Sequence, residues 1–349
     1  MGYNVCILAN EDSQSSLLWE ATLQKSNKVK TYDIIDLTSD YWLTLIQQKD
    51  YDIFLLKPPG KTELFKRLYD ERVILISQFF KIPVYPSVNE ILLYENKRFL
   101  RDWLVINQLP HPATYVFFNI KEAKEFLSSN KNFPLVGKTN IGASGNGVSI
   151  LKSRKETFEY ISRAFTKGIK PKSGPKLKKG SLLKKIQKAL AISGFLKQRL
   201  KDYQPDLLNI QYHFVIIQEF IKHNWEWRCV RIGDSFFAHK KLVQGDMASG
   251  TLKKGYNEVP EELLNFIKIV SDNHNLKSVA MDIFESDDQY YFNEIQCFFG
   301  QSDPYQMLIN DKPGRYIFKS GSWHFEEGMF NTNESYDLRL EHALSFIKY

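Results

Sequence analysis

The 349-residue sequence predicts an α/β protein whose N-terminal part is a parallel sheet covered by helices and whose remainder is of α+β type. A chain of this length exceeds one ordinary hydrophobic core, so two or three packed units are expected. Its first part alternates strand-like and helix-like segments, a pattern typical of parallel sheets. Later segments are apolar strands joined by polar turns, which favours antiparallel pairing.

The parallel domain is expected to cover residues 1–85. Strands are predicted at Tyr3–Ala9, around Thr31–Leu37 and at Asp52–Leu56, and helices at Ser15–Gln24 and Thr62–Phe80. The segment Pro58–Thr62 has the lysine and threonine of a Walker phosphate-binding loop but lacks the first glycine that this motif needs. We therefore interpret this segment as a turn that opens a helix.

A proline-punctuated connection, Ile82–Ser87, marks the start of a second part at residues 86–215. Apolar spacing in this part predicts a helix at Asn89–Asn107, a strand at Thr114–Phe118 and a helix at Ile120–Ser129.

A glycine-rich loop follows a short apolar strand that ends in Lys138, within the sequence VGKTNIGASGNGV. The central residues of the loop are Ser144, Gly145, Asn146 and Gly147. Glycines let other groups approach the backbone closely, and exposed N–H groups can form an anion-binding concavity. With a cation at its start the loop suits phosphate, although a plain hairpin loop is the alternative interpretation. A Rossmann site is disfavoured, because its glycine motif opens a helix, whereas a strand at Val148–Leu151 is predicted here.

The net charge of +7 is concentrated in a basic segment at residues 163–201. This segment holds thirteen lysines and arginines and no acidic residue, so the rest of the chain carries −6. Thr166–Gly180 is too polar to fold alone, whereas Ser181–Lys201 has an apolar helical stripe. The helix either packs on the body or offers a surface to an anionic partner, such as a membrane or a lipid-linked acceptor. No recognised nucleic-acid module accompanies the charge, so sequence-specific nucleic-acid binding is not expected.

A third part, residues 216–310, is predicted to be an antiparallel sheet with one helix. Its strands are predicted at Phe214–Phe220, Glu226–Ile232, Ser235–Val243, Ser278–Phe284 and Tyr290–Gln296, and its helix at Glu261–Asn275. The tail, residues 311–349, ends in the helical pattern Tyr336–Tyr349. We expect the tail to pack against the body without contributing chemistry.

Polar residues embedded in these apolar strands form the predicted site. Side chains alternate between the two faces of a strand, so Glu294 and Gln296 are expected to share a face with Tyr290 and Phe292 and to meet Asp282 across a hairpin. Carboxylate and amide oxygens of this kind suit Mg²⁺, which proteins hold through one or two carboxylates together with nucleotide phosphates.

Basic residues accompany the carboxylates. Glu226 and Arg228 share one face of their strand, and Lys240 and Lys241 occupy opposite faces of the next, so one of the two lysines can point inward with them. Positioned cations and a metal ion are what phosphoryl transfer requires, because they offset the charge on the transferred group.

The three cysteines, Cys6, Cys229 and Cys297, are odd in number and lack the spacing of a zinc site. We expect each to be a small buried apolar residue in a reducing compartment. The sequence has no apolar run of about 18 residues and no signal-peptide pattern, so a cytoplasmic protein is expected. Its basic segment could hold it peripherally at a membrane surface.

Five motifs follow one another between residues 86 and 310. They are Glu95–Lys97, Pro134–Val148, Gln218–Ile221, Glu226–Gly233, and Met281-Asp282 with Asn293–Gln296. In this order they resemble the ATP-grasp superfamily, in particular its carboxylate–amine ligases of the ribosomal-protein glutamate ligase and glutathione synthetase type. The resemblance implies that the N-terminal α/β domain is followed by two ATP-grasp subdomains that clasp the nucleotide.

The resemblance also implies how ATP would be bound. Lys97 and Lys138 would contact its phosphates beneath a mobile lid that runs from Ser144 through Gly145 and Asn146 to Gly147. Glu226 would bind the ribose hydroxyls. The hinge that holds adenine would consist of Gln218, Glu219, Phe220 and Ile221.

The implied Mg²⁺ site consists of Asp282, Glu294 and Gln296. Arg228 would steady an acyl phosphate, and Lys240 and Lys241 are the other candidate catalytic cations. Two departures from the family stand out. Gln296 replaces the usual asparagine and is one methylene longer, and Met247–Thr251 replaces the family's Arg-Ser-Asn element, so substrate contacts there do not transfer.

These expectations favour an ATP- and Mg²⁺-dependent ligase that forms an amide or peptide bond through an acyl phosphate. The acid would be a small-molecule, peptide or glycan carboxylate, and an amine would displace the phosphate. Two alternatives stay open: a kinase of the same superfamily that phosphorylates a hydroxyl group, and a nucleotide-binding module without catalysis. The sequence carries no signal for an oligomeric state.

Overall fold

The computed structural model describes residues 2–142, 145, 147–170, 209–244, 247–248, 254–256, 258–301 and 303–347. The chain divides into two compact units. Unit 1 consists of Met1–Pro59, Leu64–Pro112 and Ile221–Tyr349, and unit 2 of Gly60–Glu63 and Ala113–Phe220. The domain boundaries predicted after residues 85, 215 and 310 stay predictions.

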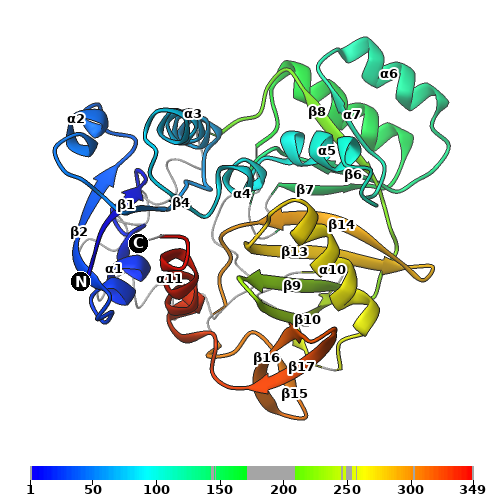
Figure 1. Ribbon diagram of the computed structural model, residues 1–349. Coiled ribbons are helices and arrows are strands. Elements are labelled where there is room, and N and C mark those ends of the chain that lie inside the picture. Colours follow the sequence, from blue (N-terminus) through cyan, green and yellow to red (C-terminus); the bar gives the residue numbers. More distant parts are fainter. Residues whose placement is uncertain are drawn as a thin grey trace, which may run out of the picture. The chain divides into compact units, whose positions relative to one another are not determined.

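Unit 1 contains a four-stranded parallel sheet in the order β2-β1-β3-β4 (Figure 1). Its strands are β1 (Tyr3–Ala9), β2 (Val29–Asp36), β3 (Ile53–Leu56) and β4 (Val84–Tyr85). The helices between them are α1 (Leu17–Leu23), α2 (Trp42–Ile46) and α3 (Glu63–Phe79). The apolar strand β3 is wholly buried, as expected for the interior of a parallel sheet. The predicted parallel α/β arrangement is confirmed, and α2 is an additional helix.

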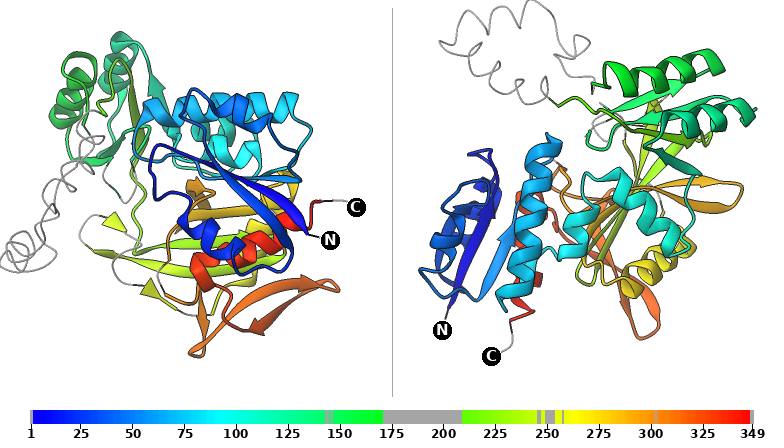
Figure 2. Two further views of the ribbon diagram at one scale, coloured as in Figure 1. Left: turned by 90° about the vertical axis from the view of Figure 1, so that its left-hand side faces the viewer. Right: turned by 90° about the horizontal axis from the view of Figure 1, so that it is seen from above.

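The C-terminal helix α11 (Tyr336–Leu344) completes the hydrophobic core of this parallel sheet. A 3-10 turn, η2 (Thr332–Ser335), leads into it. The ring of Tyr336 meets the ring of Trp19 edge-on, with centroids 4.7 Å apart, and Leu340 is buried in the same core. Helix α11 therefore lies beside α1 (Figure 2). The expectation that the tail packs against the body is confirmed for this helix.

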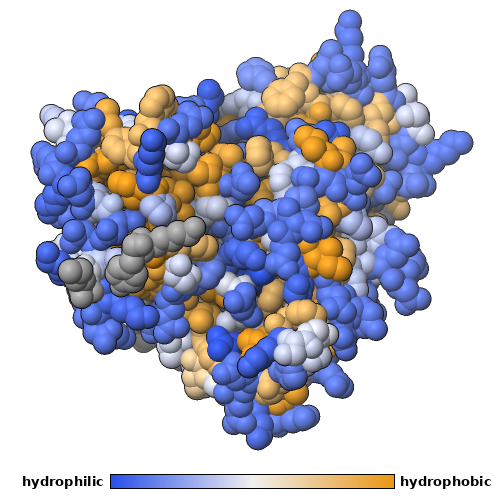
Figure 3. Space-filling view, in the orientation of Figure 1, coloured by the Kyte–Doolittle hydropathy of each residue, from blue (hydrophilic) through white to orange (hydrophobic). Residues whose placement is uncertain are grey.

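The second sheet of unit 1 is antiparallel, in the order β14-β13-β9-β10-β16-β15, with β11 and β12 paired to β10 and β17 paired to β16. Its strands are β9 (Trp225–Ile232), β10 (Ser235–Gln244), β11 (Met247–Ala248), β12 (Lys254–Gly255), β13 (Ser278–Ser286), β14 (Gln289–Gln296), β15 (Leu308–Ile309), β16 (Lys312–Lys319) and β17 (Ser322–Glu327). Helix α10 (Glu261–Asn273) packs on it through Leu263 and Ile267, and the outward side of α10 is mainly hydrophilic (Figure 3). The predicted antiparallel sheet with a helix is confirmed for four of its five predicted strands. The strand predicted at Phe214–Phe220 is wrongly assigned, because it pairs with strands of the sheet in unit 2.

The sequence analysis does not predict the hairpin formed by β16 and β17. Its turn is Ser320-Gly321, and both residues have positive φ, 53° and 83°. Two-residue turns with positive φ at both positions match the twist of a hairpin. A Ser-Gly pair between two alternating stretches is therefore the sequence signal for this hairpin.

The single helix predicted at Asn89–Asn107 is wrong at its centre. The structure has two helices, α4 (Val88–Leu93) and α5 (Lys97–Ile106). Glu95, between them, has a φ of 47°, which the interior of a right-handed helix does not permit. The side chain of Asn96 then caps α5 by accepting a hydrogen bond from the backbone N–H of Phe99.

Among its described residues, unit 2 is an antiparallel sheet in the order β5-β8-β6-β7 with two helices. Its elements are β5 (Thr114–Phe117), α6 (Ile120–Ser129), β6 (Leu135–Lys138), β7 (Val148–Leu151), α7 (Arg154–Thr166) and β8 (Val215–Glu219). Both helices share a core with the sheet that includes Leu135 and Val215. The helix predicted at Ser181–Lys201 lies outside the described residues. In the described part of the chain, no helix has the length and apolar character needed to span a membrane.

Gly137 of β6 is needed because the ring of Tyr160 from α7 lies directly over it. A Cβ atom at Gly137 would stand 2.5 Å from Cζ of Tyr160. We expect Gly137→Ala to lower the free energy of unfolding in urea by about 1–3 kcal/mol, as overpacking does. Ser149→Ala, at the paired position of β7, removes an atom instead and should cost less. Equal losses in the two variants would contradict the steric explanation.

The three cysteines are free thiols, and all three are buried. Burial raises the pKa of each thiol above its ordinary value, so little reactive thiolate forms. The prediction that they are small buried apolar residues is confirmed.

Candidate active site

The candidate site lies on one face of the antiparallel sheet in unit 1, where polar side chains from neighbouring strands meet. In the register of the sheet, Arg228 of β9 stands opposite both Asp282 of β13 and His239 of β10. Glu226 stands opposite Lys241. Directly opposed residues of antiparallel strands project from the same face, so the register itself collects these charges.

Asp282 is at the centre of the cluster. Its carboxylate accepts hydrogen bonds from Arg228 at both oxygens, with Nε 2.5 Å from Oδ1 and a terminal nitrogen 3.0 Å from Oδ2. Nζ of Lys241 lies 2.6 Å from Oδ2. Burial raises the pKa of Asp282, but the charges of Arg228 and Lys241 outweigh burial and lower it to about 2. Asp282 is therefore ionised at neutral pH.

Glu226 shares Lys241 with Asp282 and also accepts a hydrogen bond from the side-chain amide of Asn293. Burial raises the pKa of Glu226; the charge of Lys241 opposes that rise, and the charge of Asp282 adds to it. Lys241 is thus held between two carboxylates.

A second group of charges surrounds Lys97, the first residue of α5. Its Nζ atom lies 3.3 Å from Oε1 of Glu294 and 3.7 Å from Oε2 of Glu95. Gln296 donates to the other oxygen of Glu95 over 3.3 Å. Burial lowers the pKa of Lys97, but Glu294 and Glu95 outweigh it and raise the pKa above its ordinary value.

A β-bulge sets which residues of β14 face this site. Glu294 pairs with Asp282 and Phe292 pairs with Ile283, so Asn293 is the additional residue. The predicted common face of Glu294 with Tyr290 and Phe292 is therefore wrong. Phe292 is fully buried and stacks on Phe266 of α10, whereas Glu294 lies with Asp282 and Lys97.

The structure shows which of the two neighbouring lysines, Lys240 or Lys241, faces the carboxylates. Lys241 faces the carboxylates, whereas Nζ of Lys240 lies 3.9 Å from the ring centre of Trp225 and 4.8 Å from that of Trp227. Lys240 is thus not brought together with the other candidate catalytic residues. Its contacts are those of a cation stacked on indole rings.

Sequence reasoning assigned no role to two neighbours of the cluster, His239 and Glu95. His239 is buried, its Nδ1 lies 2.8 Å from the carbonyl oxygen of Gln306, and burial together with the charges of Arg228 and Lys254 lowers its pKa to about 3. It stands two residues before Lys241, so strand alternation was the signal for it. Glu95 belongs to the motif Glu95–Lys97, but its position beside Lys97 depends on the break between α4 and α5, which helical periodicity does not predict.

The remaining predicted nucleotide contacts, except Ile221, belong to unit 2. Lys138 is buried at the end of β6, and the backbone N–H of Thr139 donates to the carbonyl of Gly147 over 2.8 Å, which closes the base of the glycine-rich loop. Gly145 has a φ of 76°. Gln218 is buried and donates to Oγ1 of Thr114 over 2.8 Å.

The other predicted nucleotide contacts are the hinge residues that follow Gln218 and two residues of the glycine-rich loop. Glu219 ends β8, Phe220 is the last residue of unit 2, and Ile221 begins the returning segment of unit 1. Ser144 and Asn146 lie outside the described residues.

The oxygen donors in unit 1 fit a magnesium ion in their chemistry. Asp282 and Glu294 are directly opposed carboxylates, and Gln296 adds an amide oxygen two residues further along β14. Among the described residues no three His, Cys, Asp or Glu side chains are grouped to hold a metal. Two carboxylates completed by phosphate oxygens and water are the usual set for Mg²⁺ at a nucleotide site.

Solved structures of similar fold cover nearly the whole chain. N5-carboxyaminoimidazole synthetase from Staphylococcus aureus matches 98% of this chain and 77% of its own, at 10% identity and a TM-score of 0.56. D-alanine–D-alanine ligase from Bacillus anthracis matches 99% of this chain and 97% of its own, at 14% identity and a TM-score of 0.53. The same ligase complexed with ATP matches 99% of this chain and 98% of its own, at 15% identity and a TM-score of 0.52.

No protein-family model matches the chain, and the comparison with curated protein sequences finds no match. The resemblance carried by the five motifs is confirmed at the level of the fold. The chain has the ATP-grasp fold that these solved structures share.

Proposed function

We propose that the protein is an ATP- and Mg²⁺-dependent ligase that joins a carboxylate to an amine. The observation that carries the proposal is the cluster in which Arg228 and Lys241 hold Asp282 beside Glu294 on one sheet face. Cations next to two carboxylates suit the movement of a phosphoryl group. The fold, shared with a D-alanine–D-alanine ligase complexed with ATP, supports the same class of reaction.

In the proposed reaction, a carboxylate oxygen of the acid substrate attacks the γ-phosphorus of ATP, and ADP leaves. An amine then attacks the carbon of the acyl phosphate and loses a proton, and inorganic phosphate leaves as the amide forms. Arg228 and Lys241 offset the negative charge that develops on the phosphoryl and acyl oxygens. Bound Mg²⁺, held by Asp282, Glu294 and Gln296, supplies Lewis-acid polarisation of the phosphates.

Other roles complete the proposal. Lys97, Lys138 and the glycine-rich loop contact the phosphates, Gln218–Ile221 holds the adenine, and Glu226 binds the ribose. Most of the basic segment lies outside the described residues, so its anionic or lipid-linked partner stays a prediction. The cytoplasmic location stays a prediction as well.

Glu294→Gln tests the metal part of the proposal. We expect Mg²⁺ to tighten ATP binding to the wild type in calorimetry. The variant should lose about 10- to 100-fold of metal-dependent affinity, the range found when a metal's ligand shell is disturbed. Glu285→Gln is the matched control, because Glu285 accepts a hydrogen bond from Trp227 on the opposite face of the sheet. Equal Mg²⁺ dependence in all three proteins would contradict the assignment of Glu294.

Hydroxylamine distinguishes the ligase from the kinase. A hydroxamate that forms only with ATP and an added carboxylic acid indicates an acyl phosphate and supports the ligase. A stable phosphate ester of a hydroxyl substrate, without any hydroxamate, would favour the kinase. ATP binding without turnover of any acid or alcohol would favour a binding module.

A further inference from the structure

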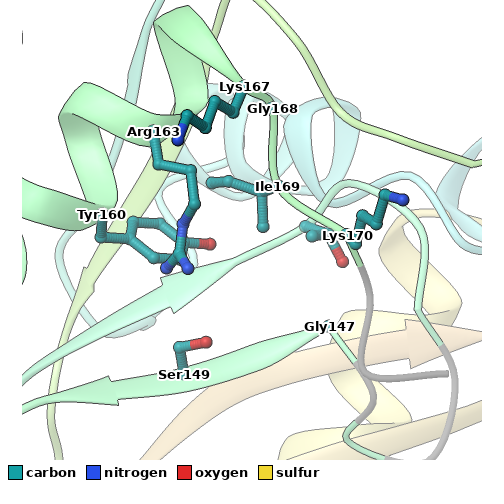
Figure 4. A pocket seen from close by; sticks show the side chains of 9 residues that line it. Gly147, Ser149, Tyr160, Arg163, Lys167, Gly168, Ile169 and Lys170 are labelled. Carbon is teal, nitrogen blue, oxygen red and sulfur yellow. The ribbon is translucent and has the colours of Figure 1, made fainter. Parts of the chain in front are cut away.

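Unit 2 contains a pocket that has Gly147, at the base of the glycine-rich loop, among its lining residues. Its volume is about 360 Å³, and it is lined by the end of β6, the start of β7, the C-terminal part of α7 and the chain that follows (Figure 4). The ring of Tyr160 in its wall lies against Gly137, so the pocket is on the helix-covered side of the sheet. Lys138 projects from the other side, because neighbouring residues of a strand alternate.

The pocket is strongly cationic. Arg163 and Lys167 of α7 and Lys170 just beyond it contribute three positive charges to its lining, and no acidic residue is among the lining residues. Solvated cations around one concavity raise the local concentration of anions. A guanidinium group also binds two oxygens of one phosphate or carboxylate side by side.

A buried hydroxyl group in this pocket lacks a partner. Tyr160 is 1% exposed, and its hydroxyl oxygen has no hydrogen-bond partner among the described residues. An unpaired buried hydroxyl is costly, so native structures rarely keep one without a ligand or water. Burial raises the pKa of Tyr160, so the hydroxyl keeps its proton and can donate it.

Tyr160, Arg163 and Ser149 lie on one side of the pocket, whereas the ammonium groups of Lys167 and Lys170 point away from its centre (Figure 4). Figure 4 shows the hydroxyl end of Tyr160 beside the guanidinium group of Arg163, with Ser149 of β7 across from them and Lys170 on the far side. The guanidinium carbon lies 5.8 Å from the centre of the tyrosine ring. A bound anion could thus meet two hydroxyl groups and a guanidinium fork at once.

We propose that this pocket binds a small phosphate-bearing molecule, separately from the proposed ATP site. A phosphate dianion offsets more of the three cationic charges than a carboxylate does, and its oxygens accept from Tyr160, Arg163 and Ser149 together. The volume of the pocket is at the lower end of the range for ligand sites, which suits a phosphate attached to a small organic group.

Inorganic phosphate is the probe for this proposal. The full chain is titrated by calorimetry with phosphate replacing chloride at constant ionic strength, and we expect saturable binding. Tyr160→Phe should weaken it about tenfold or more, since it removes one hydrogen bond to a charged ligand. Arg163→Gln should weaken it further. The phenylalanine ring still covers Gly137, so the thermal midpoint of Tyr160→Phe without phosphate should not fall.

Lys138→Met separates this pocket from the proposed nucleotide site. Phosphate binding that survives in Lys138→Met but weakens in Tyr160→Phe and Arg163→Gln supports the pocket. Binding that is lost in Lys138→Met and unchanged in the two pocket variants would assign the phosphate to the nucleotide site and overturn the proposal. Absence of saturable phosphate binding in the wild type would overturn it as well.

Discussion

Asp282→Ala is expected to lower the free energy of unfolding by about 3–5 kcal/mol, the cost of leaving buried charges without their partner. The side chain of Asp282 is 6% exposed, and its carboxylate pairs with both Arg228 and Lys241. Without it, the two buried cations lose the carboxylate that they share, and the nearby Glu226 and Glu294 offset only part of their charge. Urea denaturation at neutral pH, followed by tryptophan fluorescence, measures the loss.

Asp303→Ala is the control for this prediction. Asp303 also pairs with a lysine, Lys254, at 2.5 Å, but its side chain is 40% exposed. Exposed ion pairs contribute about 0–1 kcal/mol, so this variant should be nearly as stable as the wild type. Similar losses in Asp282→Ala and Asp303→Ala would mean that Arg228 and Lys241 do not depend on the Asp282 charge.

Acidification is expected to destabilise the protein through His239. The folded pKa of this residue is about 3 and its ordinary value is 6.5, so between these pH values the unfolded chain binds one more proton than the folded chain. The contribution of the buried, neutral His239 to the free energy of unfolding is therefore fully present above pH 6.5 and is lost as the pH falls toward 3. One proton corresponds to a slope of about 1.4 kcal/mol per pH unit.

The measurement is the difference in unfolding free energy between wild type and His239→Asn from pH 4 to pH 7. His342, whose pKa burial lowers to about 4, titrates in the same window but is common to both proteins, so it cancels in the difference. The difference should change with pH by about the slope of one proton. Parallel stability curves would show that His239 is already accessible to protons in the folded state.

Much of this site follows from strand alternation alone. The parity of Glu226 and Arg228 along one apolar strand predicts that they share a face, and the register then brings Asp282 of the neighbouring strand to the same face. Alternation could not decide between Lys240 and Lys241, because it gives two faces without saying which one meets the carboxylates. In the structure, Lys240 stacks on Trp225 and Trp227 of the other face, so Lys241 is the lysine that faces the carboxylates.

The two incorrect predictions, the face of Glu294 and the continuous helix at Asn89–Asn107, share a physical cause. The bulge at Asn293 and the positive φ of Glu95 are single-residue irregularities, and each reverses or redirects every side chain that follows. Nothing in the local sequence marks either of them strongly, because they are stabilised by tertiary partners such as the contact of Asn293 with Glu226. Periodic patterns predict regular elements, whereas irregularities depend on the finished fold.

The placement of α11 against the first sheet has a consequence for synthesis on the ribosome. Thr22 of α1 and Asp337 of α11 are hydrogen-bonded although 315 positions separate them in the chain. The first sheet is translated early, yet its apolar surface around Trp19 gains the cover of Tyr336 and Leu340 only when the last helix emerges. The entropy cost of closing so long a loop grows only slowly with its length. The contact between α11 and the first sheet nevertheless has to wait until α11 has been synthesised. The nascent N-terminal sheet therefore keeps an uncovered apolar face until α11 has been synthesised.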